Sequence, residues 1–465
     1  MSPTLALFIW LILLLFLFVF DPARDPKTSV ALWVPLAWLC IVASRLPSQW
    51  LGVQVGMGGL AHAFEEGNSI DSTVYSVLIL LAIAILIWRS FRWGKFFARN
   101  FALTALLSYA LLSVLWSDFP FITFKHWFRD LGNYLAILVV LSDPRPLEAV
   151  RTLLRRLAYL LIPLSILLVK YFPAIGRQYG ITGEGPYYSG ATTSKNMLGV
   201  LCLVSALFFF WDTVTRWPDR KERQTRRIVL INVALMGMTL WLLVGSQSAT
   251  SKLCLALGFL VIAAAQTKTV KRHPGLLTVS VPIGICLYLV LAFGFGININ
   301  TEIARAVGRD ATLTGRTVIW DAVLSTHTNP LVGSGYETFW LGPRLEKIWG
   351  MGVLVNEAHD GYLEVYLNLG IIGLFLLTAF LISSYRTARA QLKAFPILGS
   401  FTFALWSILP LYNITESAFR GQLMWVIFLL GAMVVPTASP AGALAPAELP
   451  VTDESITNVQ DTVTI

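Results

Sequence analysis

Charge is scarce in this sequence. Only 13% of its 465 residues are Asp, Glu, Lys or Arg, against roughly a quarter in soluble domains, and 56% are hydrophobic. Uncharged runs near the about 17–25 residues needed to cross a bilayer recur along the chain. They include 4–20, 28–44, 74–88, 100–117, 228–245, 274–297 and 394–411. This pattern excludes a soluble globular protein and predicts an all-α integral membrane fold.

Cysteine is scarce as well. The four cysteines all fall inside apolar runs and form no metal-ligand spacing, so we expect small hydrophobic side chains and no disulfides. The first apolar run is not preceded by a basic segment, and Asp21-Pro22 follows it where a cleavage site would need small residues. We therefore expect a retained helix and no cleaved signal peptide.

Several catalytic motifs are missing from the sequence. It contains no phosphate-cradling loop, no His-Glu-x-x-His and no pair of carboxylates of the DxD type that holds a metal against a nucleotide sugar. Chemistry on a phosphate would therefore depend on basic side chains, and we expect neither a metal nor another cofactor.

The apolar runs predict thirteen membrane spans, or twelve if residues 28–46 enter the membrane without crossing it. The expected spans are 4–20, 28–46, 74–88, 100–117, 129–142, 153–170, 196–212, 228–245, 253–266, 274–297, 361–385, 394–411 and 421–436. We assign residues 1–435 to one polytopic membrane domain. The Pro/Ala-rich and then acidic segment 436–465 is expected to be a disordered cytoplasmic tail.

Basic residues orient these spans. Twenty Lys and Arg residues lie in the short connections 89–99, 143–156, 216–227, 267–273 and 386–393. Only twelve lie in the alternating set, which is longer in total and comprises 117–129, 170–195, 246–252, 296–360 and 412–420. The positive-inside rule places the first set in the cytoplasm. The net charge of +9 is thus read as an orientation signal and not as a nucleic-acid surface.

The longest connection, 296–360, is expected on the extracytoplasmic side and to be partly helical. An amphipathic pattern begins at Thr314-Gly315-Arg316 and ends near Asn329-Pro330, as a helix does before proline. Gly333-Ser334-Gly335 then predicts a turn.

Polar residues near the outer membrane face are the candidates for chemistry, since charge in the hydrocarbon is costly and is rarely retained without a partner or a task. His359 is the most specific candidate, because a histidine can accept a proton from a hydroxyl near neutral pH and carboxylates flank it in the sequence. A structural interfacial histidine is the alternative. The other candidates are Arg129 with Asp130, Arg177, Lys195, Lys252, Arg316, Asp360, Glu364, Glu416 and Arg420.

Basic residues at predicted helix starts could bind an anion. Arg316 opens the loop helix, and its guanidinium fork suits phosphate oxygens; a loop salt bridge is the alternative. Lys195 begins a span after a Gly/Ser/Thr-rich stretch, and Lys252 follows a similar one, so each either binds an anion or extends from the interface to water. The Arg129–Asp130 pair is expected to be structural.

Seven short motifs resemble, in order and spacing, those of the O-antigen ligase and polysaccharide polymerase superfamily (the Wzy/WaaL type), particularly its exopolysaccharide-polymerase-like branch. The resemblance runs from about residue 108 to 430. The motifs are Trp116-Ser117-Asp118-x-Pro120, Ser194-Lys195-Asn196-Met197-Leu198-Gly199, Ser246-Gln247-Ser248, Gly315-Arg316-Thr317-x-x-Trp320, Asn329-Pro330-Leu331-x-Gly333-x-Gly335, Ala358-His359-Asp360-Gly361-Tyr362-Leu363-Glu364 and Asn413-x-Thr415-Glu416-Ser417.

The resemblance implies a membrane-embedded, GT-C-like glycosyltransferase of the bacterial inner membrane. Such a protein takes a glycan from an undecaprenyl-diphosphate carrier on the periplasmic side. It passes the glycan to another lipid-linked glycan, as a polymerase, or to lipid A-core, as a ligase. Membrane lipids and other proteins of polysaccharide assembly are its further expected partners, and nucleic acid is not.

Carried over by position, the resemblance gives His359 the role of assisting the acceptor hydroxyl and Arg316 that of gripping the donor pyrophosphate. Lys195, Lys252, Arg177, Asp360 and Glu364 are expected to bind substrate. Two positions depart from the family: Ala249 stands where Arg or Lys often follows Ser-x-Ser, and Asp360 stands where asparagine is frequent.

A transporter or lipid flippase would share the many spans. Transporters, however, tend to carry ionisable residues near mid-bilayer and to show repeated halves. The candidate charges here gather at the outer face, and we find no repeat in the sequence. The transferase interpretation is therefore favoured over the transporter, while polymerase and ligase stay open.

Overall fold

The computed structural model describes residues 1–19, 29–53, 68–179, 186–290 and 316–436. The first half of the chain contains α1 Pro3–Val19, η1 Val30–Leu32, α2 Trp33–Val42, α3 Pro47–Trp50, α5 Ser69–Trp88, α6 Trp93–Arg99, α7 Phe101–Leu112, η3 Ser113–Leu115, α8 Pro120–Leu141, α9 Pro146–Tyr171 and α10 Pro173–Gly176. After the strands β1 Arg177–Gln178 and β2 Tyr187–Tyr188 come α11 Lys195–Arg216, η4 Trp217–Asp219, α12 Arg223–Ser246, α13 Ala249–Gln266, α14 Lys268–Arg272 and α15 Gly275–Leu289. The last group is α17 Arg316–Leu324, α18 Gly342–Gly350, α19 Gly361–Ala394, α20 Pro396–Tyr412 and α21 Leu423–Ala432.

The predicted all-α membrane fold is confirmed. Six of the described helices are long and apolar enough to cross a membrane, or seven if the sharply bent pair Trp93–Arg99 and Phe101–Leu115 forms one span. Five further apolar helices are shorter, at 10–17 residues. Each of the thirteen expected segments contains a helix, although the end of the segment 274–297 and the tail 437–465 lie outside the described residues.

Serine and proline residues mark the starts of several helices. Ser194 and Ser248 accept backbone N–H groups at the starts of α11 and α13, which satisfies donors that have no partner within the helix. Proline opens α8, α9 and α20, where its missing N–H has no consequence.

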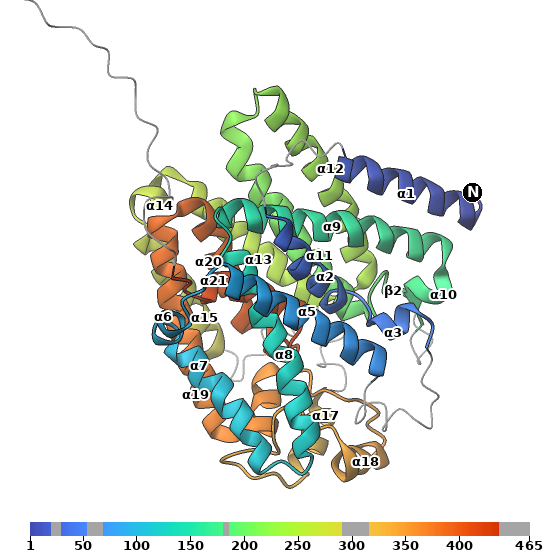
Figure 1. Ribbon diagram of the computed structural model, residues 1–465, viewed down its shortest axis with the longest axis vertical. Helices are drawn as coiled ribbons and strands as arrows, with labels where there is room; N and C mark the ends of the chain where they lie inside the picture. Colours follow the sequence, from blue (N-terminus) through green and yellow to red (C-terminus); the bar gives the residue numbers. More distant parts are fainter. Residues whose placement is uncertain (20–28, 54–67, 180–185, 291–315, 437–465) are drawn as a thin grey trace, which may run out of the picture.

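Helix α11 lies at the centre of the bundle (Figure 1), where it contacts α9, α12, α13, α20 and α21. Its side chains are buried from Leu198 almost without interruption to Thr213, and α21 is buried along its whole length. A helix that is apolar on every side is stable only in such a position. By contrast, α1 lies at the periphery and contacts α9, with most of its apolar side chains exposed.

Contacts between connections follow the expected alternation. Within the set expected outside, contacts join Ser117 to Thr338, Asp118 to Arg344, Arg316 to Glu416, Thr250 to Thr415 and Arg420 to Glu337. Within the other set, a contact joins Arg89 to Asp143, and Arg151 contacts Thr215, which directly precedes the connection 216–227. The polar residues considered below thus come together from connections that are far apart in the sequence.

Helix α19 is broken at Gly370, whose backbone is non-helical with φ 65° and ψ −165°. The segment 329–335 fills the break: the carbonyls of Pro330 and Leu331 accept the N–H groups of Ile371 and Ile372. In return, Ser334 and Gly335 donate to the carbonyls of Leu367 and Asn368. These bonds replace the helical ones that the break removes, as a membrane environment requires.

The break divides α19 into a short first segment and a longer second segment. The segment 361–369 carries Glu364 and bonds to the loop segment 329–335, and the longer segment 371–394 follows the break. Helices α17 and α18 lie at one end of the molecule, the lower end in Figure 1. The first part of α19 and the start of α8 lie at the same end.

Candidate functional site

Glu416 is the meeting point of three segments. Its carboxylate accepts hydrogen bonds of 3.0 Å to both oxygens from the amide of Asn196, at the start of α11. Nη2 of Arg316, at the start of α17, lies 3.4 Å from Oε1, and Nδ1 of His359 lies 3.8 Å from Oε2. The structure thus brings Arg316 and His359 to the same carboxylate, which is itself buried at 5% exposure.

His359 lies in a strained turn between two carboxylates. Its φ is +51°, a left-handed conformation that non-glycine residues rarely adopt and that is typical of functional positions. Nδ1 lies 3.1 Å from Oε1 of Glu357, but neither this contact nor the one to Glu416 has hydrogen-bond geometry, so among the described residues this buried nitrogen lacks a hydrogen-bond partner. The side chain is 25% exposed and so is reachable from solvent.

The carboxylates control the protonation of His359. Burial acts to lower the pKa of the imidazole, but Glu416 and Glu357 together outweigh it and raise the pKa of His359 above its ordinary value. At 3.8 Å the Glu416 contact is too long for a hydrogen bond, so we attribute its effect to charge. Arg316 acts in the opposite direction.

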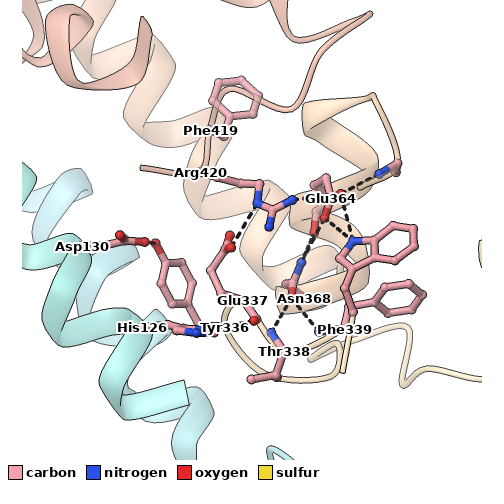
Figure 2. Close-up of polar contacts among 12 residues, drawn as sticks. His126, Asp130, Tyr336, Glu337, Thr338, Phe339, Glu364, Asn368, Phe419 and Arg420 are labelled. Atoms are coloured by element: carbon pink, nitrogen blue, oxygen red, sulfur yellow. Dashed lines mark hydrogen bonds and ion pairs between the residues drawn. The ribbon is translucent and has the colours of Figure 1, made fainter. Parts of the chain in front are cut away.

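A second buried ion-pair cluster lies beside the first and is drawn in Figure 2. Nε of Arg420 lies 3.0 Å from Oε2 of Glu337, and its Nη1 lies 3.6 Å from Oε1 of Glu364. Glu337, like His359, has a left-handed backbone. Tyr336 donates a 2.9 Å hydrogen bond to Asp130, which ties the loop to α8. The 413–422 connection therefore carries both Glu416 and Arg420, one for each cluster.

The expected substrate-binding residues separate into two groups. Asp360 and Glu364 flank the His359 turn: Asp360 caps α19 by accepting from Leu363 N–H, and burial raises the pKa of its carboxyl. Glu364 is 2% exposed and its oxygens accept hydrogen bonds from the backbone of Ala358 and the indole of Trp340.

Arg129 and Asp130 form the expected ion pair, at 3.0 Å.

The three other residues expected to bind substrate are basic and lie outside the connection 296–360. Lys195 begins α11 next to Asn196, and its ammonium lies 4.8 Å from the ring centre of Tyr187. Lys252 lies in the first turn of α13, which contacts the Glu416 connection through Thr250 and Thr415. Arg177 donates to the carbonyl of Val169 and faces the ring of Tyr188, and neither partner is a residue that contacts Glu416.

Glu357, His359 and Glu416 are the group that can hold a metal ion among the described residues, because one ligand atom of each lies within 4.8 Å of the others. A cationic side chain already lies beside this group. Arg316 already faces Glu416, and its positive charge opposes a divalent ion at that position. The donor set therefore suits a proton on His359 and a guanidinium at least as well as a metal.

The central role of Glu416 was missed by sequence reasoning. The sequence marked it as an outer-face candidate within Asn413-x-Thr415-Glu416-Ser417 but assigned it no task. The motif did contain a signal, since Asn413 accepts the N–H groups of Ala418 and Phe419 and so shapes the turn that presents Glu416. Chemically, the site offers a base between carboxylates next to a guanidinium, which suits removal of a hydroxyl proton beside an anion.

Part of the chain is similar to known proteins. Residues 231–378 match the O-antigen ligase family, and this segment contains Arg316, His359 and Glu364. The chain is also 26% identical over 295 residues to the exopolysaccharide production protein ExoQ of Rhizobium meliloti (strain 1021), which covers 60% of this chain. The match spans 63% of the length of that relative.

Proposed function

We propose that the protein transfers a glycan from an undecaprenyl-diphosphate carrier to an acceptor hydroxyl in surface polysaccharide synthesis, and the match of residues 231–378 to the O-antigen ligase family supports this proposal. The observation that carries the proposal is the meeting of Arg316 and His359 at Glu416. A base and a cation are the two groups that such a transfer needs when no metal assists it.

The proposed reaction is a direct displacement at the anomeric carbon. The acceptor oxygen forms the new glycosidic bond while the bond from the anomeric carbon to the diphosphate oxygen breaks. The hydroxyl proton goes to His359, and the electron pair leaves with the diphosphate. Attack from the face opposite the leaving group inverts the anomeric configuration. Arg316 neutralises charge on the departing diphosphate, where oriented donors act most strongly.

Charge asymmetry supports a periplasmic site in the bacterial inner membrane. The connections that contribute Glu416, His359, Arg316 and Arg420 all belong to the set that is poor in basic residues. We accordingly assign catalysis to the partly helical connection 296–360, within a polytopic domain of residues 1–435. Lys195 and Lys252, at helix starts near Glu416, are proposed to bind further phosphate oxygens of the donor.

Two acceptors are compatible with the family. Similarity to a protein named for exopolysaccharide production favours a polymerase, whose acceptor is another lipid-linked glycan. The name of the matched family favours a ligase, whose acceptor is lipid A-core. Deleting the gene separates them: loss of polymer points to polymerase, and intact polymer that stays on its carrier lipid points to ligase.

The test of the site uses the full chain reconstituted with a lipid-linked glycan. We expect His359→Ala and Arg316→Ala each to lower transfer by at least about a hundredfold, the range for a lost general base or oriented charge. His327→Ala and Arg344→Ala are matched controls, since His327 is an exposed histidine of the same loop and Arg344 pairs with the exposed Asp118. Full activity in either test variant removes that residue from the mechanism.

A further inference from the structure

Trp320 connects the helix that carries Arg316 to the turn that carries His359. Its indole N–H donates a 3.0 Å hydrogen bond to the carbonyl of Ala358, the residue directly before His359. Arg316 and Trp320 are four residues apart on α17 and therefore share one face of that helix. The family motif Gly315-Arg316-Thr317-x-x-Trp320 thus contains one residue that reaches Glu416 and one that reaches the His359 turn.

Glu364 holds the other side of the same residue. Its Oε1 accepts a 2.7 Å hydrogen bond from Ala358 N–H, and Ala358 is fully buried. The Glu364 carboxylate is itself kept in place by the indole of Trp340, at 3.0 Å and 3.1 Å from its two oxygens, and by the amide of Asn368. Both backbone polar groups of Ala358, its N–H and its C=O, are therefore bonded to side chains from separate helices.

This double attachment explains how the strained turn persists. A left-handed backbone at a non-glycine residue such as His359 is strained and remains only where its surroundings over-determine it. The turn is also held on its far side, where Gly361 N–H donates to the carbonyl of Asn413, in the connection that carries Glu416. Three elements of the proposed site, α17, α19 and the Glu416 connection, thus all bond to the four residues 358–361.

We propose that Trp320 and Glu364 are positioning residues that hold His359 at a set distance and angle from Arg316. This inference rests on the proposed function and deepens it. Glu364 then acts through Ala358, and the substrate contact expected for it from the sequence is replaced by an internal one. Trp320 also acts through Ala358. The distance between His359 and Arg316 is thus set by the hydrogen bonds of Ala358 to Trp320 and Glu364.

Loss of one attachment should therefore lower transfer without removing a reacting group. Misplacement by about 1 Å can cost on the order of a hundredfold in rate. For Trp320→Phe, which removes the N–H and keeps an aromatic ring, we expect a tenfold to hundredfold fall in kcat/KM. Benzothienylalanine at position 320, which replaces only the indole N–H by sulfur, is the variant to use if Trp320→Phe does not fold.

Trp349→Phe is the matched control. Trp349 lies in the same loop and also donates its indole N–H to a backbone carbonyl at 3.0 Å, but this carbonyl belongs to Val355, which precedes the residues 358–361. A general loosening of the loop would affect both variants alike. Only attachment of the His359 turn predicts a large loss in one and little loss in the other.

The experiment has two arms, both on the full chain in lipid nanodiscs. In the first, hydrogen–deuterium exchange of the peptide spanning 358–364, which excludes the Val355 carbonyl held by Trp349, should quicken at least tenfold in Trp320→Phe and stay unchanged in Trp349→Phe. In the second, Trp320→Phe should lower transfer in the parent protein but have no further effect in the His359→Ala background, because a positioning residue acts through the residue it positions. Unchanged exchange, or an equal fold-loss in both backgrounds, would overturn the proposal.

The two arms separate this inference from the proposed function. If His359→Ala keeps full activity, the proposed mechanism fails, yet the exchange arm still decides whether Trp320 holds the turn. If His359→Ala is inactive and the exchange of 358–364 does not respond to Trp320→Phe, the mechanism survives and the positioning role is wrong.

Discussion

Oε2 of Glu416 faces Nδ1 of His359 across 3.8 Å. Glu357 lies on the same nitrogen at 3.1 Å, so two carboxylates flank the imidazole. A negative charge at this distance favours the imidazolium, and it does so more strongly in a partly buried site than in water. Glu416, in the connection between α20 and α21, therefore raises the basicity of His359, the proposed catalytic base.

The pH dependence of transfer should report this contact. His359 must be neutral to accept a proton, so activity is expected to rise with pH through the pKa of His359, which lies above its ordinary value. Glu416→Gln removes a charge that raises this pKa, so the acidic limb of the kcat/KM profile should move to lower pH. Glu346→Gln, in the exposed face of α18, should leave the limb in place. A limb that moves upward in Glu416→Gln would contradict the assignment.

Metal removal provides a second prediction. Glu357, His359 and Glu416 could bind an ion, but the Arg316 guanidinium lies 3.4 Å from Glu416 and opposes one. We expect dialysis against EDTA to leave transfer unchanged within about twofold, because oriented cationic side chains supply the charge neutralisation. Loss of activity that added divalent ions restore would assign these three residues to a metal and would remove the free imidazole from the mechanism.

Much of this fold could be predicted from local patterns. Uncharged runs mark the helices, and Ser194, Ser248 and Asp360 mark three helix starts by their capping chemistry. The break in α19 could not be predicted in this way, since Gly370-Ile371-Ile372-Gly373 fits an unbroken apolar span. Its cause lies in the distant segment 329–335, whose carbonyls supply the partners that make a break possible.

The site shows the same division. Residue chemistry and family resemblance were enough to single out His359 and Arg316, but neither indicates which carboxylate lies beside them. Glu357 and Asp360 are the sequence neighbours of His359, yet Glu416, from a separate connection, contacts both residues. Likewise, Glu364 was expected to touch substrate because its side chain is charged, and its burial depends on Trp340 and Arg420, which only folding brings near.

The stability of the second cluster should depend on Arg420. Removing one partner of a buried ion pair leaves an uncompensated charge and typically costs about 3–5 kcal/mol. Arg420 is 27% exposed, so we expect Arg420→Met to lower the free energy of unfolding by about 2–3 kcal/mol. Arg344→Met is the control, because its partner Asp118 is 63% exposed and such pairs contribute at most about 1 kcal/mol. Equal changes in thermal unfolding would show that the cluster is not stabilising.

Gly370 allows the sharpest test of the broken helix. Its backbone, with φ 65° and ψ −165°, lies in a region that is essentially restricted to glycine. A Cβ at this position would lie 2.2 Å from the carbonyl oxygen of Leu331, one of the two carbonyls that close the break. Gly370→Ala must therefore both strain its own backbone and push the 329–335 segment away.

We expect Gly370→Ala to lower the free energy of unfolding by at least about 3 kcal/mol, through backbone strain and overpacking together. Gly237→Ala is the matched control, since Gly237 lies inside α12 with no atom within 4 Å of the added Cβ, and alanine there should be neutral or slightly stabilising. Thermal unfolding in detergent, followed by tryptophan fluorescence, compares the two. If Gly370→Ala unfolds at the parent temperature, α19 is continuous in the protein, and the 329–335 segment cannot be what holds the loop against the membrane domain.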